Sequence, residues 1–435
     1  MKSESSGSEK QAALKFIGRA FHYRNYRLFF GGQGLSLIGT WMQQIAMSWL
    51  VYRLTNSAFL LGFIGFTGQI PTFIFSSFAG VFADRLDRRK LLLVTQTLAM
   101  IQAFLLAFLT LTGTIAVWHL IVLSIFLGFI NAFDMPTRQS FVVDMVENKE
   151  DLGNAIALNS FMFNGARLVG PSIAGLLIGI VGEGLCFLLN AISFLAIIIA
   201  LLAMKIPKIR KKKLHSVLVL QELKEGYKYA FGFAPIRYII LLLGLISLMG
   251  MPYLVLMPIF ARDILHGGPH TLGFLMGASG IGALAGAIYL ASRKTVLGLG
   301  RLIVIASSTF GVGLIAFSFS RYIQLSLCMM LLVGFGMIVQ MASSNTILQT
   351  IVDEDKRGRI MSFYAMAFMG MAPFGSLLAG SLASRIGAPD TLIISGAACI
   401  IGSLLFFTKL PLIRKIVRPI YLQMGIIREM PTELQ

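Results

Sequence analysis

The stretch GVFADRLDRRK, residues 80–90, is the part of the sequence that decides the fold. Six of its eleven residues are charged, although it lies between two long apolar runs. An ionised side chain costs about 2.5 kcal/mol or more at the centre of a membrane-spanning helix. The stretch is therefore interpreted as a short loop in water between two membrane-spanning helices.

The remainder of the chain has the composition of an integral membrane protein. Its 435 residues are 56% hydrophobic and 13% charged, whereas a soluble domain carries about 25% charged residues. Runs of about 20 apolar residues are long enough to cross a bilayer. The sequence predicts an all-α integral membrane protein with twelve such spans, at residues 27–52, 58–82, 91–111, 116–135, 154–180, 184–206, 236–261, 271–292, 302–319, 322–347, 360–385 and 390–410.

The basic residues are distributed very unequally between the two sides of these spans. Of the 37 Lys and Arg residues, 32 lie on the side of the N-terminal tail, and four (Arg53, Arg262, Arg321 and Arg385) lie on the other. Because basic residues accumulate on the cytoplasmic side, we expect both termini in the cytoplasm of a bacterial inner membrane. The net charge of +18 then reflects topology and attraction to anionic lipid, and nucleic acid is not an expected partner.

A polar segment divides the chain into two halves. Residues 207–235 contain Pro207 and the run RKKK at 210–213, and we expect a basic amphipathic linker on the inner membrane surface. The predicted organisation is a tail (1–24), a six-helix bundle (25–206), this linker, a second six-helix bundle (236–411) and a C-terminal tail (412–435). The first tail lacks the apolar core and cleavage site of a signal peptide.

The two halves resemble each other at an offset of about 205 residues. The matching positions are Gly153 and Gly358, Gly170 and Gly375, Ala174 and Ala379, Gly175 and Gly380, and Gly182 and Gly387. Parallel repeats of six helices predict a central pathway between two bundles.

Several motifs carry a family resemblance that covers essentially the whole chain. GVFADRLDRRK resembles the signature of the loop between spans two and three in the major facilitator superfamily, and ARLVGPSIAG (166–175) resembles its fifth-span antiporter motif, with alanine at 166 and 174 where glycine is usual. FFGGQGLSLIGTWMQQIAMSWLVY (29–52), NAFDMPTRQSF (131–141) and DKRGRIMS (355–362) are similar to the drug–proton antiporter branch that includes enterobactin exporters and macrolide efflux pumps. The resemblance implies proton-coupled efflux of an amphipathic small molecule, a siderophore or a drug, by alternating access.

The resemblance also assigns a conformational latch to the inner side. Its expected residues are Gly80, Asp84, Arg85, Arg88, Arg89, Asp134 and Gly358. We expect Asp84 to face the start of span eleven near Gly358, where a helix N-terminus favours a carboxylate, and Arg88 to pair with Asp134. The alternative is that these charges only hold the loop in water.

The antiporter-like motif contributes Arg167, Gly170, Pro171 and Gly175. Arg167 lies deep in the fifth span, so it either binds an anionic group of the substrate or forms a structural pair with a neighbouring helix. The two glycines and the proline would allow close approach and bending of that helix.

Polar residues inside the spans predict a lined pathway. Gln33, Thr40 and Gln44 share one face of the first span at spacings i, i+7 and i+11. Further candidates are Asn131, Asn159, Gln340 and Ser344, with Asn131, Asp134 and Arg138 on one face of span four. The alternative for each residue is a hydrogen bond between helices.

The inventory of reactive groups bears on mechanism. All 19 acidic residues and all five histidines are assigned to tails, loops or span ends, so no carboxylate is expected at mid-membrane and Asp134 is the nearest candidate to bind a proton. This pattern favours an amphipathic or anionic substrate.

The other function classes lack residue patterns in their favour. Cys186, Cys328 and Cys399 lie singly in apolar runs, which predicts neither a metal site nor a disulfide, and no cofactor is expected. We expect a monomer that transports a small molecule. The alternatives are a uniporter, an importer, a polytopic membrane enzyme or a scaffold; an enzyme predicts clustered catalytic or metal-binding residues, which the sequence does not show.

Overall fold

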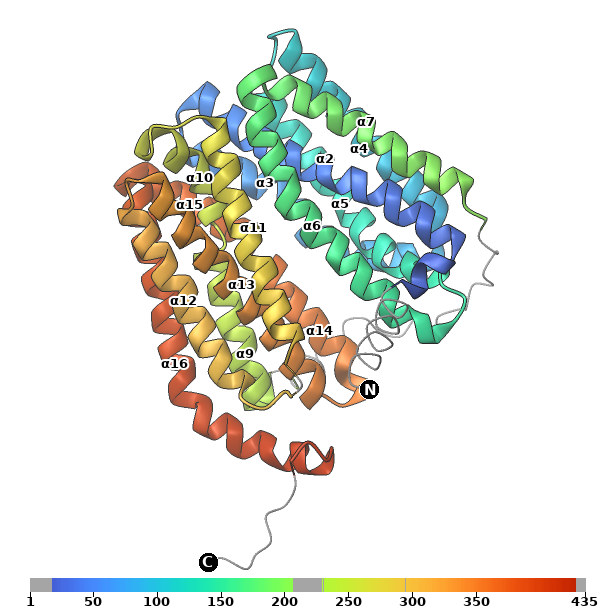
Figure 1. Ribbon diagram of the computed structural model, residues 1–435, viewed down its shortest axis with the longest axis vertical. Coiled ribbons are helices and arrows are strands. Elements are labelled where there is room, and N and C mark those ends of the chain that lie inside the picture. Colours follow the sequence, from blue (N-terminus) through green and yellow to red (C-terminus); the bar gives the residue numbers. More distant parts are fainter. Residues whose placement is uncertain (1–17, 206–228, 230, 294, 428–435) are drawn as a thin grey trace, which may run out of the picture. The chain divides into compact units, whose positions relative to one another are not determined.

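The computed structural model describes residues 18–205, 229, 231–293 and 295–427, and within these ranges all regular structure is helical (Figure 1). The side chains of residues 77, 78, 80–85, 149 and 355 also lie outside the description. The elements are η1 (Arg19–His22), α2 (Arg24–Thr55), α3 (Ala58–Arg85), α4 (Arg88–Leu111), α5 (Val117–Asp144), α6 (Lys149–Val181), α7 (Glu183–Ala203), α9 (Ala234–Leu245), η2 (Ile246–Gly250), α10 (Tyr253–Ile259), η3 (Phe260–Ile264), α11 (Pro269–Ala291), α12 (Leu299–Phe319), α13 (Ile323–Ile351), α14 (Glu354–Met369), α15 (Ala372–Ile386) and α16 (Ala388–Gln423).

Each of the twelve predicted spans corresponds to a helical segment. The seventh span is a succession of α9, η2, α10 and η3, in which two π-helical turns interrupt the α-helix, and the eleventh consists of α14 and α15. Within the described ranges, eleven segments are apolar and long enough to cross a membrane. The remaining one, α2, has 32 residues but carries several glutamines and glycines that lower its hydropathy.

Two span ends differ most from their predicted positions. Span four was expected to end at residue 135, but α5 continues to Asp144. Span twelve was expected to end at residue 410, but α16 continues to Gln423. Polar residues beyond the apolar run remain helical in both, although Pro136 lies inside α5 and Pro411 and Pro419 lie inside α16.

Local sequence explains where several helices begin and end. Asp87 caps α4 by accepting a hydrogen bond from the Lys90 amide, and Asn148 caps α6 by accepting one from the Glu150 amide. Gly182 follows α6 with φ of 80°, and its counterpart in the repeat, Gly387, follows α15 with φ of 88°. Glycine tolerates these positive φ values without steric cost.

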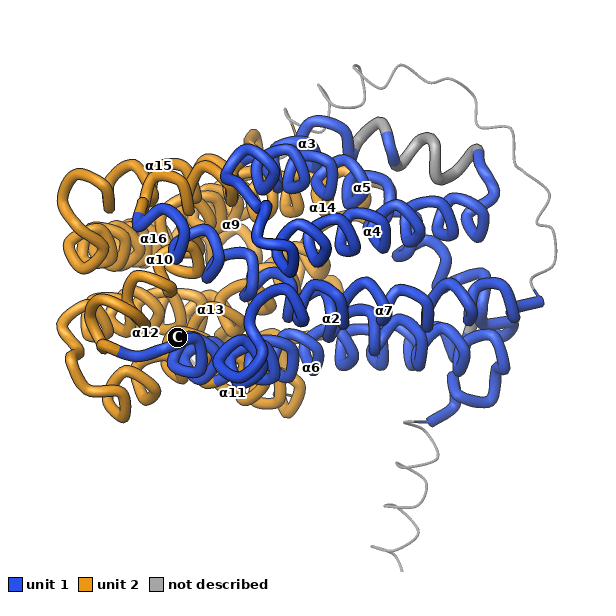
Figure 2. The backbone as a smooth tube through the Cα atoms, turned by 90° about the horizontal axis from the view of Figure 1, so that it is seen from above, with its two compact units in different colours: residues 1–56, 67–213, 267–277 blue, residues 57–66, 214–266, 278–435 orange. Residues whose placement is uncertain are grey.

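The chain forms two compact units, coloured separately in Figure 2. Unit 1 comprises residues 1–56, 67–213 and 267–277, and unit 2 comprises residues 57–66, 214–266 and 278–435. The first residues of α3 therefore belong to unit 2, and the first residues of α11 belong to unit 1.

Within unit 1, α2 lies against α7 and α6, and α4 lies against α7 and α5 (Figure 1). Phe29, Leu37, Ile130, Phe141 and Phe194 belong to the hydrophobic core that these helices share. Within unit 2, α12 lies against α13 and α16.

A chain of buried amides also joins three helices of unit 1. Asn190 Nδ2 donates to Gln43 Oε1 (2.8 Å), and Gln43 Nε2 donates to Gln102 Oε1 (2.9 Å). Gln102 Nε2 then donates to the Leu123 carbonyl (3.2 Å). Buried amides are costly unless they are hydrogen-bonded, so this chain fixes the mutual register of α2, α4 and α7.

Candidate functional site

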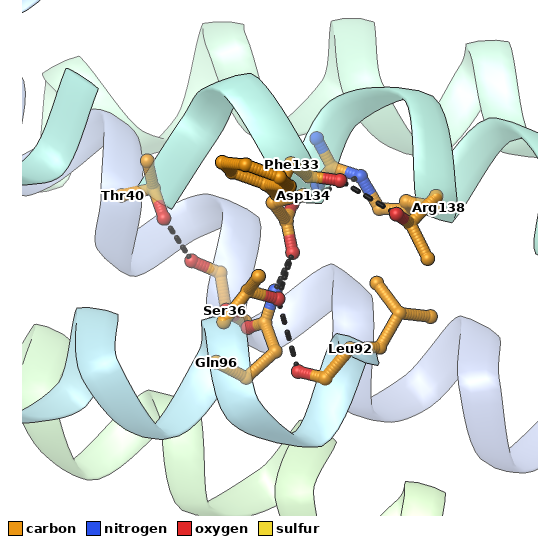
Figure 3. A network of polar contacts seen from close by, with 9 residues as sticks. Ser36, Thr40, Leu92, Gln96, Phe133, Asp134 and Arg138 are labelled. Carbon is orange, nitrogen blue, oxygen red and sulfur yellow. Dashed lines mark hydrogen bonds and ion pairs between the residues drawn. The ribbon is translucent and has the colours of Figure 1, made fainter. Parts of the chain in front are cut away.

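A buried carboxylate lies at the centre of a polar cluster that joins α4 and α5 (Figure 3). Asp134 of α5 is only 5% exposed. Its Oδ1 accepts hydrogen bonds from Gln96 Nε2 (2.7 Å) and Thr95 Oγ1 (3.0 Å), both on α4. Its Oδ2 lies 3.6 Å from Nε of Arg138, one turn along α5. The predicted common face of Asp134 and Arg138 is confirmed, and Asn131 is half-buried in the same helix.

The stretch predicted as a short loop, residues 80–90, is helical except at residues 86 and 87, and its charges pair differently from the prediction. Arg88 was expected to pair with Asp134, but its Nη1 lies 2.9 Å from Asp144 Oδ1 and also donates to the Ser140 carbonyl. The prediction assumed that span four ended near residue 135. Because α5 continues for nine residues beyond that point, the acid within reach of Arg88 is Asp144.

Arg89 binds within the same unit. Its Nε donates to the Leu201 carbonyl (2.6 Å) and its Nη2 to the Leu202 carbonyl (2.8 Å). A guanidinium at this place satisfies free carbonyls of the last turn of α7. This contact favours the anchoring interpretation for Arg89. The side chains of Asp84 and Arg85, and that of their neighbour Gly80, lie outside the described residues.

The polar stripe of α2 divides into a buried part and an exposed part. Thr40 and Gln44 are exposed, as expected for residues that line an aqueous face, but Gln33 is only 2% exposed. Leu37, which lies between them on the same face, belongs to the hydrophobic core of unit 1. The stripe is therefore covered by packing near the start of α2 and open further along the helix.

Arg167 of α6 lies over an aromatic ring of α2. Its guanidinium carbon is 5.7 Å from the centroid of Trp41, and Trp41 in turn makes an edge contact with Phe163 at 5.9 Å. A guanidinium over an indole face is attracted by the ring quadrupole. The three side chains form a cationic and aromatic cluster, which we call the Arg167 cluster.

The Arg167 cluster lies beside further polar groups of α6. Ser160, Phe163, Asn164 and Arg167 follow the spacing i, i+3, i+4 and i+7, which places them on one helical face. Ser160 is exposed, and its carbonyl accepts a hydrogen bond from Asn164 Nδ2 (2.8 Å). Asn159, the residue predicted for the pathway, is half-buried.

The motif glycines make the close helix contacts that were predicted. A Cβ on Gly170 would lie 2.5 Å from Trp41 Cβ, and a Cβ on Gly175 would lie 2.7 Å from the Cα of Gly273 at the start of α11. In unit 2 the counterpart Gly380 makes the same contact with Gly62, also at 2.7 Å. Pro171 lies inside α6, which remains helical around it.

The candidates from the second half are arranged differently. Gln340 and Ser344 are both buried, and Gln340 Nε2 donates to Ser344 Oγ (3.3 Å). This hydrogen bond lies within α13, so it is not the bond between helices that was the alternative for that pair. Gly358 is exposed in the second turn of α14, and an added Cβ would meet no atom within 4 Å.

Several residues of these clusters were not predicted from the sequence. Thr95 and Gln96 complete the Asp134 site, and Trp41, Ser160 and Asn164 complete the polar face of α6 and its neighbour. Their signal is weak, because single hydroxyls, amides and aromatic rings in an apolar run also occur in ordinary helix packing.

Comparison with curated proteins gives relatives along most of the chain. It is 27% identical over 386 residues to a staphyloferrin A transporter of Staphylococcus aureus, covering 88% of this chain and 95% of that protein. It is 25% identical over 356 residues to the multidrug efflux pump Tap of Mycolicibacterium fortuitum (80% and 86% covered), and 22% identical over 390 residues to macrolide efflux protein A of Streptococcus pyogenes (87% and 95% covered).

Solved structures of similar fold are also transporters. A bacterial homologue of the lysosomal transporter Spinster matches with a TM-score of 0.69 at 13% identity, covering 94% of this chain and 99% of that one. A bacterial homologue of the iron transporter ferroportin matches with a TM-score of 0.67 at 18% identity, covering 88% and 98%. These likenesses establish the fold.

A family model described as transmembrane secretion effector matches residues 20–417, which is nearly the whole chain. The family and the relatives are transporters, in agreement with the multi-pass helical fold. The chain therefore belongs to the transmembrane secretion effectors, a family of membrane transporters within the major facilitator superfamily.

Proposed function

We propose that this transporter is a proton-coupled exporter of an amphipathic small molecule of the siderophore or drug class, working by alternating access in a bacterial inner membrane. The observation that carries the proposal is the exposed polar face in unit 1, made of Thr40 and Gln44 on α2 and Ser160 on α6. Hydroxyls and amides along long apolar helices are typical of a water-filled pathway. The relatives named for siderophore transport, drug efflux and macrolide efflux support export of this class.

The Arg167 cluster supports an anionic or amphipathic substrate. A guanidinium binds carboxylates through two parallel hydrogen bonds, and the aromatic rings of Trp41 and Phe163 offer apolar surface beside it. A molecule with a carboxylate and an apolar body would satisfy both parts of the cluster.

The same proposal includes the topology and the latch. The distribution of basic residues supports cytoplasmic termini, and we expect the protein to act as a monomer in contact with anionic lipid. Asp84 would face the first turns of α14 near Gly358 in one state of the cycle and separate from them in the other. Arg88 would support the loop through Asp144.

Transport into inverted membrane vesicles tests this function. The probes are radiolabelled erythromycin and staphyloferrin A, each offered with an acidic lumen. We expect accumulation that disappears when a protonophore collapses the gradient. Equilibration of the substrate without accumulation, unaffected by the protonophore, would favour the uniporter, and uptake only into right-side-out vesicles would favour the importer.

Two substitutions of one residue test the substrate class. Arg167→Met removes the charge, and we expect at least a tenfold loss of affinity for a carboxylate substrate, since a charge-assisted hydrogen bond contributes about 1.5–3 kcal/mol. Arg167→Lys keeps the charge and should retain part of the affinity. If both variants transport the substrate as well as the wild type does, Arg167 serves only in helix packing.

A further inference from the structure

Asp134 differs from the other buried acids of unit 1 in its position. The sequence placed it at the end of span four, but α5 continues ten residues beyond it, or about 15 Å at the rise of an α-helix. Asp144 closes that helix, and Glu183 begins α7. Among the described acids of α5 and α7, Asp134 therefore lies inside a membrane-spanning helix, whereas the others lie at helix ends.

Its ion pair is also the loosest of three comparable pairs. The carboxylates of Asp134, Asp144 and Glu183 have similarly small exposed fractions, between 7 and 8%. Glu183 lies 2.7 Å from Arg53 and Asp144 lies 2.9 Å from Arg88, which are distances of charge-assisted hydrogen bonds. The 3.6 Å between Asp134 and Arg138 is longer than that range. The partner of Asp134 is thus held weakly and can be released.

The surroundings of Asp134 contain spare hydrogen-bond acceptors. Gln96 Oε1 is buried and has no partner within the described part of the chain. Thr95 Oγ1 has one proton to donate, but two acceptors lie within reach, Asp134 Oδ1 at 3.0 Å and the Leu92 carbonyl at 3.1 Å (Figure 3). Either group could accept the hydrogen bond that Asp134 would donate if Oδ1 itself carried a proton.

Few other charges face this site from the neighbouring helices. On α4 the charged residues end at Lys90, and α2 has none between Arg27 and Arg53. α3 has none between residues 58 and 83, and the side chains of Asp84 and Arg85 lie outside the described residues. On α6, Asp151 accepts from Tyr23 and Arg167 lies over Trp41. The charge balance at Asp134 therefore depends chiefly on Arg138.

We propose, building on the proposed proton-coupled function, that Asp134 is the residue that binds the transported proton. In the ionised state the carboxylate holds Arg138. A proton from water binds Oδ1, the new O–H donates to Gln96 Oε1 after rotation of the amide or to Thr95 Oγ1, and the loss of negative charge releases Arg138. Release of the proton restores the pair. The arrangement of α4 against α5 thereby responds to pH at one carboxyl group.

Infrared difference spectroscopy of the full-length protein in lipid tests the assignment directly. The carbonyl stretch of a protonated carboxyl group should appear on acidification of the wild type. We expect Asp134→Asn to lack this band and Asp144→Asn to retain it, since Asp144 is an equally buried acid of the same helix. A band that persists in Asp134→Asn would overturn the proposal.

A second variant protects the test against misfolding of Asp134→Asn. Arg138→Gln leaves the carboxyl group in place but removes its positive partner, so the infrared band should still appear but at a changed pH. If the band appears at the same pH in Arg138→Gln as in the wild type, it does not come from the carboxyl group that contacts Arg138. That result would count against the proposal.

Vesicle transport separates this proposal from the proposed function. We expect Asp134→Asn to exchange erythromycin or staphyloferrin A across the membrane but to lose accumulation driven by the pH gradient. Gradient-driven accumulation by Asp134→Asn would overturn the assignment of Asp134 while leaving proton-coupled export intact. Gradient-independent transport by the wild type would overturn the coupling itself, whatever the infrared result.

Discussion

Arg88 Nη1 lies 2.9 Å from Oδ1 of Asp144, which joins the first turn of α4 to the last turn of α5. The Asp144 side chain is largely buried and that of Arg88 is about a quarter exposed. Removal of either partner takes the counter-charge away from a partly buried ionised group, and we expect Arg88→Ala or Asp144→Asn to lower the free energy of unfolding by about 2 kcal/mol. Thermal unfolding of the purified protein in detergent measures this loss.

The exchanged double variant is the control for that prediction. Arg88→Asp combined with Asp144→Arg restores opposite charges at the same two positions and should recover part of the lost stability. If both single variants unfold like the wild type, the pair contributes nothing measurable and the loop is held by Arg89 alone.

Gln43 and Gln44 allow packing and pathway to be separated at neighbouring positions. Gln43 is buried in the amide chain with Asn190 and Gln102, whereas Gln44 is exposed. Gln43→Leu removes one hydrogen-bond partner from each of two buried amides, so we expect a loss of about 1–3 kcal/mol in unfolding free energy. Gln44→Leu should leave stability unchanged within about 0.5 kcal/mol and should reduce transport. Melting and vesicle assays check both assignments. Lost stability in Gln44→Leu, together with unchanged stability and reduced transport in Gln43→Leu, would contradict them.

The sequence predicted those features of the fold that depend on local composition. Twelve apolar runs each correspond to a helical span, because the hydropathy that selects a span is a property of consecutive residues. The end of α5 was misplaced because the polar stretch after Asp134 remains helical up to Asp144. The paired glycines of the repeat were found from sequence, since close helix contacts require residues without a side chain.

The candidate site could be predicted only in part. Gln33, Thr40 and Gln44 share a face of α2, but only tertiary packing decides that Gln33 is covered and the other two are exposed. Arg88 was assigned the wrong acid because its partner depends on the length of α5. Gln96 carried no signal beyond that of an amide in an apolar run.

Gly175 and Gly179 lie one turn apart on α6 but differ in their surroundings. A Cβ on Gly175 would lie 2.7 Å from the backbone of Gly273, whereas a Cβ on Gly179 would meet nothing within 4 Å. Gly175→Ala must displace α11 or α6, and we expect a cost of about 1–3 kcal/mol. Gly179→Ala gains helix propensity and should be neutral or slightly stabilising. Equal melting temperatures for the two variants would show that the contact with Gly273 yields without cost.

Leu35, Thr40 and Gln44 are all exposed residues of α2. Thr40 and Gln44 share one face of the helix, whereas Leu35 lies on another. Leu35 has the composition of a lipid-facing position, and Thr40 and Gln44 have that of a water-facing one. We expect single cysteines at 40 and 44 to react with a membrane-impermeant maleimide, and a cysteine at 35 to remain unlabelled. The background is a variant in which Cys186, Cys328 and Cys399 are replaced by serine or alanine. Labelling at 35 alone, or at none of the three positions, would mean that the polar face of α2 is dry and that transport must use another part of the molecule.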